Sequence, residues 1–247
     1  MSVREGVRTY LSDRLVLRTC LYLAAALGAA VLAAWPRASL EAIIRTGASS
    51  DTFTVVAMAF LVCLLFLGAR FGAQDFSPDP AVQLPEHVRL TAVSLLGLVG
   101  GRASFAVLHT ILLLLLGAPF LAAAAAVGGA GLTHVARALA ILGAAGLAGR
   151  AIGLLSNCIM GARRPLRDIA LYLFLVAVLI ATFLVATAAS PFYGLYALLE
   201  PSEGFPEWLV CVAANLLLAA AFWGLSILAL AVVRARARSF MKGHGNG

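Results

Sequence analysis

Six long runs of apolar residues dominate the sequence and leave little from which a soluble fold could be built. A helix that crosses the hydrocarbon core of a bilayer needs about 20 mainly apolar residues. The chain is 62% hydrophobic and 12% charged, which is more apolar surface than a soluble core of 247 residues can bury. The sequence therefore predicts an all-α integral membrane protein, folded as a single domain over residues 1–247 with six transmembrane helices near Thr19–Trp35, Phe53–Gly68, Ser104–Val127, Ala138–Met160, Ile169–Ala188 and Trp208–Val233.

The basic residues are distributed unevenly between the predicted spans. Cytoplasmic loops of membrane proteins retain Lys and Arg. One set of segments holds 14 basic residues: Arg4, Arg8, Arg14, Arg18, Arg70, Arg89, Arg102, Arg163, Arg164, Arg167, Arg234, Arg236, Arg238 and Lys242. The opposite set holds Arg37 and Arg45, with Arg137 at an edge. This bias predicts a multi-pass protein of the plasma or inner membrane with both termini in the cytoplasm.

Two segments outside the spans have an amphipathic helical pattern. In residues 3–18, apolar residues recur every three or four positions and charged residues occupy the other face. This pattern predicts an interfacial helix with its apolar face in lipid. Residues 84–99 follow the turn-rich stretch 76–80 and place apolar residues on one face, ending at Gly100 and Gly101. The second segment is interpreted either as a docking element for a soluble partner or as a solvated connector.

Several classes of site find no support in the sequence. The 18 basic residues lie at the ends of apolar runs and are not interleaved with exposed aromatic residues, so nucleic-acid binding is not expected. The four cysteines share no CxxC spacing, His109 and His134 have no cysteine or carboxylate arranged beside them, and no metal site is predicted. A cleaved signal peptide ending near Ala34 is the alternative for the first span, but its lead-in is long and contains Glu5 and Asp13.

The order of these parts resembles the ABC-2 type permeases, the membrane subunits of one class of ATP-binding-cassette transporter. Residues 89–102 are similar to the family's stretch in which an apolar helix led by Thr ends just before a Gly-Arg pair that opens the third span. Residues 190–199 are similar to its outer segment of proline and aromatic residues after the fifth span, predicted here over 191–207. The acidic residue that usually follows the Thr is absent, since Ala92 follows Thr91.

The resemblance implies a permease subunit, and by family an exporter, that forms the translocation path as a homodimer or with a related permease. A separate ATPase would bind ATP and Mg²⁺, because this chain has no G-x-x-x-x-G-K-[ST] loop and binds no cofactor of its own. Residues 84–99 would act as the coupling helix that contacts the ATPase. The candidate coupling residues are Leu84, Val88, Arg89, Thr91, Ala92, Leu95 and Leu96.

Arg150 is an ionisable residue inside a predicted span and is a candidate for the substrate path. A charge in this position costs some 2.5 kcal/mol or more unless it faces the protein interior or a hydrated cavity. The alternative is a shifted span from which Arg150 reaches the cytoplasmic headgroups. Around it, Gly143, Gly146, Gly149 and Gly153 form a small-residue face that is expected to pack against another helix of the same subunit.

Three other functions are alternatives to the permease. An intramembrane enzyme needs a nucleophile with a base, a carboxylate pair or a metal, and all eleven acidic residues lie outside the predicted spans, so no enzymatic activity is expected. A secondary carrier is expected to have acidic residues or paired broken helices within the membrane. A non-transporting scaffold or assembly factor is compatible with the same sequence.

Overall fold

The computed structural model describes residues 14–36, 51–73, 88, 94–160, 164–199 and 206–244. Every regular element within these ranges is helical. The elements are α2 (Arg14–Ala33), α4 (Thr52–Ala73), α6 (Leu95–Gly128), α7 (Leu132–Met160), α8 (Arg164–Val185), the 3₁₀ turn η1 (Thr187–Ala189), α9 (Pro191–Tyr196), the 3₁₀ turn η2 (Ala197–Leu199) and α10 (Glu207–His244). The described part of the chain is thus all-α, as the apolar runs predict.

Four of these helices are long and apolar enough to cross a membrane. They are Thr52–Ala73, Leu95–Gly128, Leu132–Ile159 and the Glu207–Arg236 part of α10. The apolar stretches of the other two long helices are shorter, Arg18–Ala33 in α2 and Ile169–Val185 in α8. Stretches of this length extend only about 25 Å, somewhat less than the roughly 30 Å hydrocarbon core. The fold is therefore that of a helical membrane protein with four candidate spanning helices.

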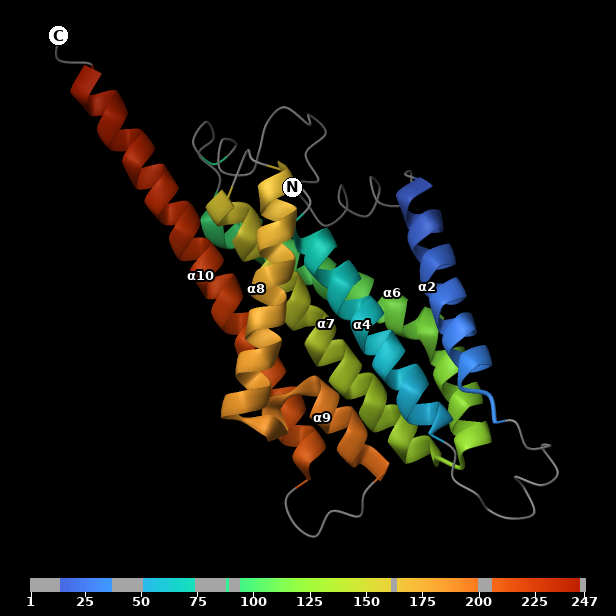
Figure 1. The fold of residues 1–247 in the computed structure, drawn as a ribbon. Helices are drawn as coiled ribbons and strands as arrows, with labels where there is room; N and C mark the ends of the chain where they lie inside the picture. The colour runs from blue at the N-terminus through green and yellow to red at the C-terminus, as the bar shows by residue number, and fades with distance from the viewer. Residues whose placement is uncertain are drawn as a thin grey trace.

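The long helices alternate in direction along the bundle (Figure 1). As a result, α2, α6 and α8 begin at the same end of the bundle at which α4, α7 and α10 finish. We call this the basic end, because the exposed residues Arg18, Arg70 and Arg236 lie there. Arg137, near the start of α7, belongs to the opposite end.

The helix boundary expected at Gly100 and Gly101 is wrong, because α6 runs without interruption from Leu95 to Gly128. The helix begins instead at Ser94, whose side chain accepts a hydrogen bond of 3.3 Å from the Gly97 backbone N–H. A glycine inside a helix costs only about 1 kcal/mol, which the cap and the burial of neighbouring side chains offset. Residues 95–99 are consequently the first turns of a spanning helix and not the end of a separate amphipathic one.

Parts of three predicted segments lie outside the described residues. They are 3–13 of the interfacial helix, 84–87 and 89–93 of the coupling helix, and 200–205 of the outer segment. Where the structure describes the interfacial segment, from Arg14 onward, the backbone is already part of α2 and continues helical into the first apolar run.

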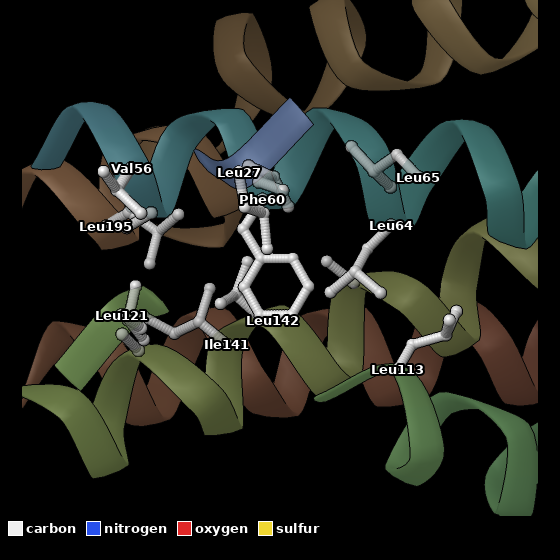
Figure 2. Packing of buried hydrophobic residues seen from close by; sticks show 14 of the residues in the cluster. Leu27, Val56, Phe60, Leu64, Leu65, Leu113, Leu121, Ile141, Leu142 and Leu195 are labelled. Carbon is white, nitrogen blue, oxygen red and sulfur yellow. The ribbon is translucent and has the colours of Figure 1, made fainter. Parts of the chain in front are cut away.

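The main core is formed by buried, mainly aliphatic and aromatic, side chains from all the long helices and from the segment of α9 and η2, including Leu171 and Leu175 of α8 and Cys211 of α10. Figure 2 shows part of it, with side chains of α4 facing those of α7. Phe60 of α4 is fully buried and lies against Gly117 of α6 so closely that a Cβ at position 117 would overlap its ring. A core of this kind fixes the positions of the helices on which the buried polar groups lie.

Glycines bring α4 and α7 into backbone contact. A Cβ at Gly153 would overlap the Ala69 carbonyl oxygen, and one at Gly68 would lie 2.9 Å from the Gly146 carbonyl oxygen. Gly149 faces Leu65 in the same way. Close backbone approach of this sort is the usual role of small residues between membrane helices. The expected packing of Gly146, Gly149 and Gly153 within one subunit is thus confirmed, while Gly143 faces Leu114 of α6.

Candidate functional site

Arg150 lies on α7 where α4 and α6 both pack against it. Its side chain is only 4% exposed. The guanidinium carbon lies 5.5 Å from the ring centroid of Phe71 on α4 and 5.8 Å from that of Phe105 on α6. A cation at this distance from an aromatic face is attracted to the partial negative charge that the ring quadrupole places on that face. Arg150 therefore bridges three helices through two aromatic rings.

His109 completes this cluster from one turn along α6. The His109 ring meets the Phe71 ring edge-on, with centroids 4.8 Å apart, and is nearly parallel to the Phe105 ring at 6.2 Å. Its side chain is 2% exposed. We refer to Arg150, Phe71, Phe105 and His109 as the cation–aromatic cluster.

The contacts between α4 and α7 give the depth of this cluster in the bundle. The two helices run parallel in a constant register, since Leu65 lies beside Gly149 and, four residues later on both helices, Ala69 lies beside Gly153. Arg150 is about 27 Å along α7 from Leu132, where the helix begins. The exposed Arg70 is adjacent in sequence to Phe71 and lies at a similar level. Because α7 ends at Met160, Arg150 lies closer to the basic end of the helix than to its start.

The structure places the Arg150 side chain inside the bundle. The side chain is enclosed by helices of its own chain, so it does not extend along the surface to the headgroups. Its neighbours in the described structure are aromatic rings. Contact with a transported substrate stays a prediction.

Val88 is the one residue of the link between α4 and α6 before Ser94 that the structure describes. It is helical, 1% exposed and packed in a small hydrophobic cluster at the basic end. The cluster contains Leu98 and Val99 of α6, Leu154 and Cys158 of α7, and Leu230 of α10. Of the other candidate coupling residues, Leu95 is half-buried and Leu96 is 73% exposed, while Leu84, Arg89, Thr91 and Ala92 lie outside the described residues.

At the opposite end, the short helix α9 and its two flanking 3₁₀ turns pack into the bundle next to α10 (Figure 1). The Asn215 amide of α10 donates a hydrogen bond of 3.0 Å to the Ala189 carbonyl of η1 and one of 2.8 Å to the Cys211 carbonyl. Gly194 of α9 lies against Cys211, whose Sγ would be 2.9 Å from a Cβ at that position. The Asn215 amide thus links α10 to the turn η1.

A second cation–aromatic contact lies near this segment. The Arg137 guanidinium carbon is 5.8 Å from the centroid of the Trp208 ring, which joins the start of α7 to the start of α10. Pro191 is the first residue of α9, where its missing N–H and fixed φ suit a helix start. The outer segment, as far as it is described, is thus a folded part of the bundle.

Sequence reasoning identified Arg150 but not the rings that surround it. The spacing of Phe105 and His109 four residues apart on one helix was an available signal, because such residues share a helix face. Nothing in the sequence pairs that face with Phe71, which is 34 positions from Phe105 along the chain. The contact arises only from the packing of α4, α6 and α7.

The described residues contain no group of three or more His, Cys, Asp or Glu side chains that could hold a metal ion. The four cysteines are free thiols, of which Cys158 and Cys211 are buried. A scan of the sequence against protein-family models finds no match, and searches of curated proteins and of solved structures find none either.

Proposed function

We propose that this chain is the membrane-spanning permease subunit of an ABC-2 type transporter, acting as an exporter together with a separate ATPase. The proposal takes α2 and α8 as spanning helices in addition to the four longer ones, giving six. Their full lengths of 20 and 22 residues correspond to about 30 and 33 Å, and their directions alternate with those of their neighbours. The basic end would face the cytoplasm of a plasma or inner membrane.

The observation that carries the proposal is the burial of Val88 against three long helices at the basic end. A segment that couples an ATPase to a membrane path must contact both partners. Val88 supplies the contact with the membrane part, since it is buried in a cluster to which α6, α7 and α10 all contribute side chains. The remaining surface of the 84–94 segment would then meet the ATPase, whose ATP and Mg²⁺ are held on its own chain.

The outer segment supports the same proposal. A loop between two spanning helices has no need of internal structure, yet η1 and α9 are folded here. Asn215 holds η1 by its hydrogen bond to Ala189, and the contact of Gly194 with Cys211 holds α9. This arrangement fits a permease that closes its path on the side away from the ATPase. The folded outer segment gives no support to a secondary carrier.

Exposed apolar surface is available for lipid and for a second permease copy. Large apolar side chains stay exposed on the outer helices, among them Leu173, Phe183 and Leu184 on α8, and Leu217, Leu225 and Leu228 on α10. In a bilayer, lipid or a partner helix covers such side chains. We propose a dimer, either of two copies of this chain or with a related permease.

The proposal is tested by co-expressing the tagged chain with the ATPase encoded beside its gene. We expect the ATPase to co-purify and its hydrolysis of ATP to change when the permease is bound. Failure of any such ATPase to co-purify, or hydrolysis indifferent to this chain, would contradict the proposal and favour a non-transporting scaffold.

Two substitutions in the link make the test more specific. Arg89→Glu reverses a charge on the segment proposed to meet the ATPase, and Thr91→Pro disrupts its backbone. Both are expected to reduce stimulation of ATP hydrolysis while leaving membrane insertion intact. Arg18→Glu is the matched control, because Arg18 is exposed at the same end but lies on α2. Equal effects of Arg89→Glu and Arg18→Glu would show that net charge, and not the link, is responsible.

A further inference from the structure

The C-terminal end of α10 extends beyond the rest of the bundle at the basic end (Figure 1). The helix comprises 38 residues, from Glu207 to His244. At 1.5 Å per residue it is about 57 Å long, whereas a bilayer with its headgroups is about 40–45 Å thick. The last turns of α10 therefore lie at and beyond the level of the headgroups.

These last turns carry only positive charge. Four basic residues fall between positions 234 and 242, namely Arg234, Arg236, Arg238 and Lys242, and no acidic residue follows Glu207 in the sequence. Arg236 is exposed and Arg234 is half-buried. Positions 234, 238 and 242 are spaced four apart, so the helical repeat aligns them along one side of α10.

The depth of these residues relative to the membrane follows from the packing of α10. Leu230 is fully buried against Leu154, Cys158 and Leu98, and marks the last layer of the protein core at this end. Arg234 comes one helical turn later, about 6 Å further along the axis. From Glu207 it is about 40 Å along the helix, which places it in the headgroup layer on this side.

We propose that this stretch of α10, residues 234–242, is an attachment site for anionic phospholipid headgroups. Arg234 and Arg236 lie at the depth of the phosphates. Position 238 is about 6 Å further along the helix, within the Debye length of about 8 Å at physiological salt, and position 242 is about 12 Å further. Clusters of four or more basic residues directly after a spanning helix are suited to this role. The proposal requires only that α10 spans the membrane and is independent of the proposed transport function.

The test uses the purified full-length protein in a neutral detergent, titrated with phosphatidylglycerol or with phosphatidylcholine of the same acyl chains. Native mass spectrometry measures the bound fraction of each lipid. We expect phosphatidylglycerol to bind more tightly than phosphatidylcholine. Because each basic residue near an anionic surface contributes about fivefold, Arg236→Gln/Arg238→Gln should weaken phosphatidylglycerol binding by about 25-fold and leave phosphatidylcholine binding unchanged.

Two control variants separate this site from other causes. Arg37→Gln/Arg45→Gln removes the same charge from the predicted outer loop and should leave both affinities within about twofold. Arg236→Lys/Arg238→Lys keeps the charge and should retain binding. Unchanged phosphatidylglycerol affinity in the Gln variant of α10 would overturn the proposal and point to an acidic protein surface as the partner. An equal loss in the loop variant would also overturn it, since net charge alone would then explain the result.

Discussion

Gly72 of α4 lies directly against the main chain of Arg150 on α7, so closely that a methyl group at position 72 would overlap the Arg150 carbonyl oxygen. This contact joins the two features that organise the bundle: the glycine-lined approach of α4 to α7 and the buried cation next to it. The stability of the protein should therefore depend on both in measurable ways.

Adding a methyl group at the glycine contact should destabilise the fold. Gly72→Ala and Gly153→Ala each place a Cβ into the backbone of the facing helix, which has no flexible side chain that could move aside. Overpacking of this kind costs about 1–3 kcal/mol in the free energy of unfolding, measured in mixed micelles. Gly224→Ala is the control, because a Cβ at Gly224 meets nothing within 4 Å. That variant should be neutral or more stable by up to about 1 kcal/mol, since alanine favours helix; equal losses at all three positions would contradict the prediction.

The attraction between Arg150 and Phe71 should appear as a coupling energy. In a double-mutant cycle of Arg150→Met and Phe71→Leu, we expect a coupling of about 1–2 kcal/mol, because the pair is buried and desolvated. Phe66→Leu is the matched control on the same helix, since Phe66 stacks on Tyr172 at 4.9 Å. Its coupling with Arg150→Met should be close to zero. A coupling with Phe71 no larger than that with Phe66 would show that the ring does not stabilise the cation.

Loss of the Asn215 amide should release the segment from η1 to α9. Asn215→Leu removes the hydrogen bonds to Ala189 and Cys211 and should cost about 1–3 kcal/mol, because it leaves the Ala189 carbonyl without this donor. Cys211, which is 0% exposed, should then react faster with a thiol reagent. Ser226→Ala is the control, since the Ser226 hydroxyl donates only to Phe222 of its own helix. Unaltered reactivity of Cys211 in Asn215→Leu would contradict the assigned role of the amide.

Substitutions at Gly117 and at Phe60, which contact each other, should partly compensate for each other's loss of stability. Gly117→Ala places a Cβ into the Phe60 ring and should lower the free energy of unfolding by about 1–3 kcal/mol. Phe60→Leu should also destabilise, by leaving space in the core. The double variant should be more stable than the sum of the two losses predicts, because each change accommodates the other. Strict additivity, measured by the same denaturation, would show that the surrounding helices shift instead.

The helices could be predicted from the sequence because lipid imposes a simple rule: a run of apolar residues must satisfy its own backbone hydrogen bonds. Their ends were less predictable. Gly100 and Gly101 resemble a helix stop, but the cap at Ser94 and the burial of Leu98 and Val99 hold the helix through them.

The candidate site was predictable only where the signal is local. Arg150 was apparent as a charge within an apolar run, and Asn215 as a polar residue in another. The rings of Phe71 and Phe105 are ordinary apolar residues in the sequence. Their role beside Arg150 depends on the register of α4, α6 and α7, which no spacing along one helix encodes.

The glycine contact between α4 and α7 also limits how the protein can move. The backbones of the two helices touch along several turns, so the helices cannot slide or rotate against each other without separating. They should therefore move as one rigid unit. Any change of shape during a working cycle must then pivot around this pair. Among the outer helices, α8 leaves large apolar side chains such as Leu173, Phe183 and Leu184 exposed, and it would move through lipid while the central pair of helices stays still.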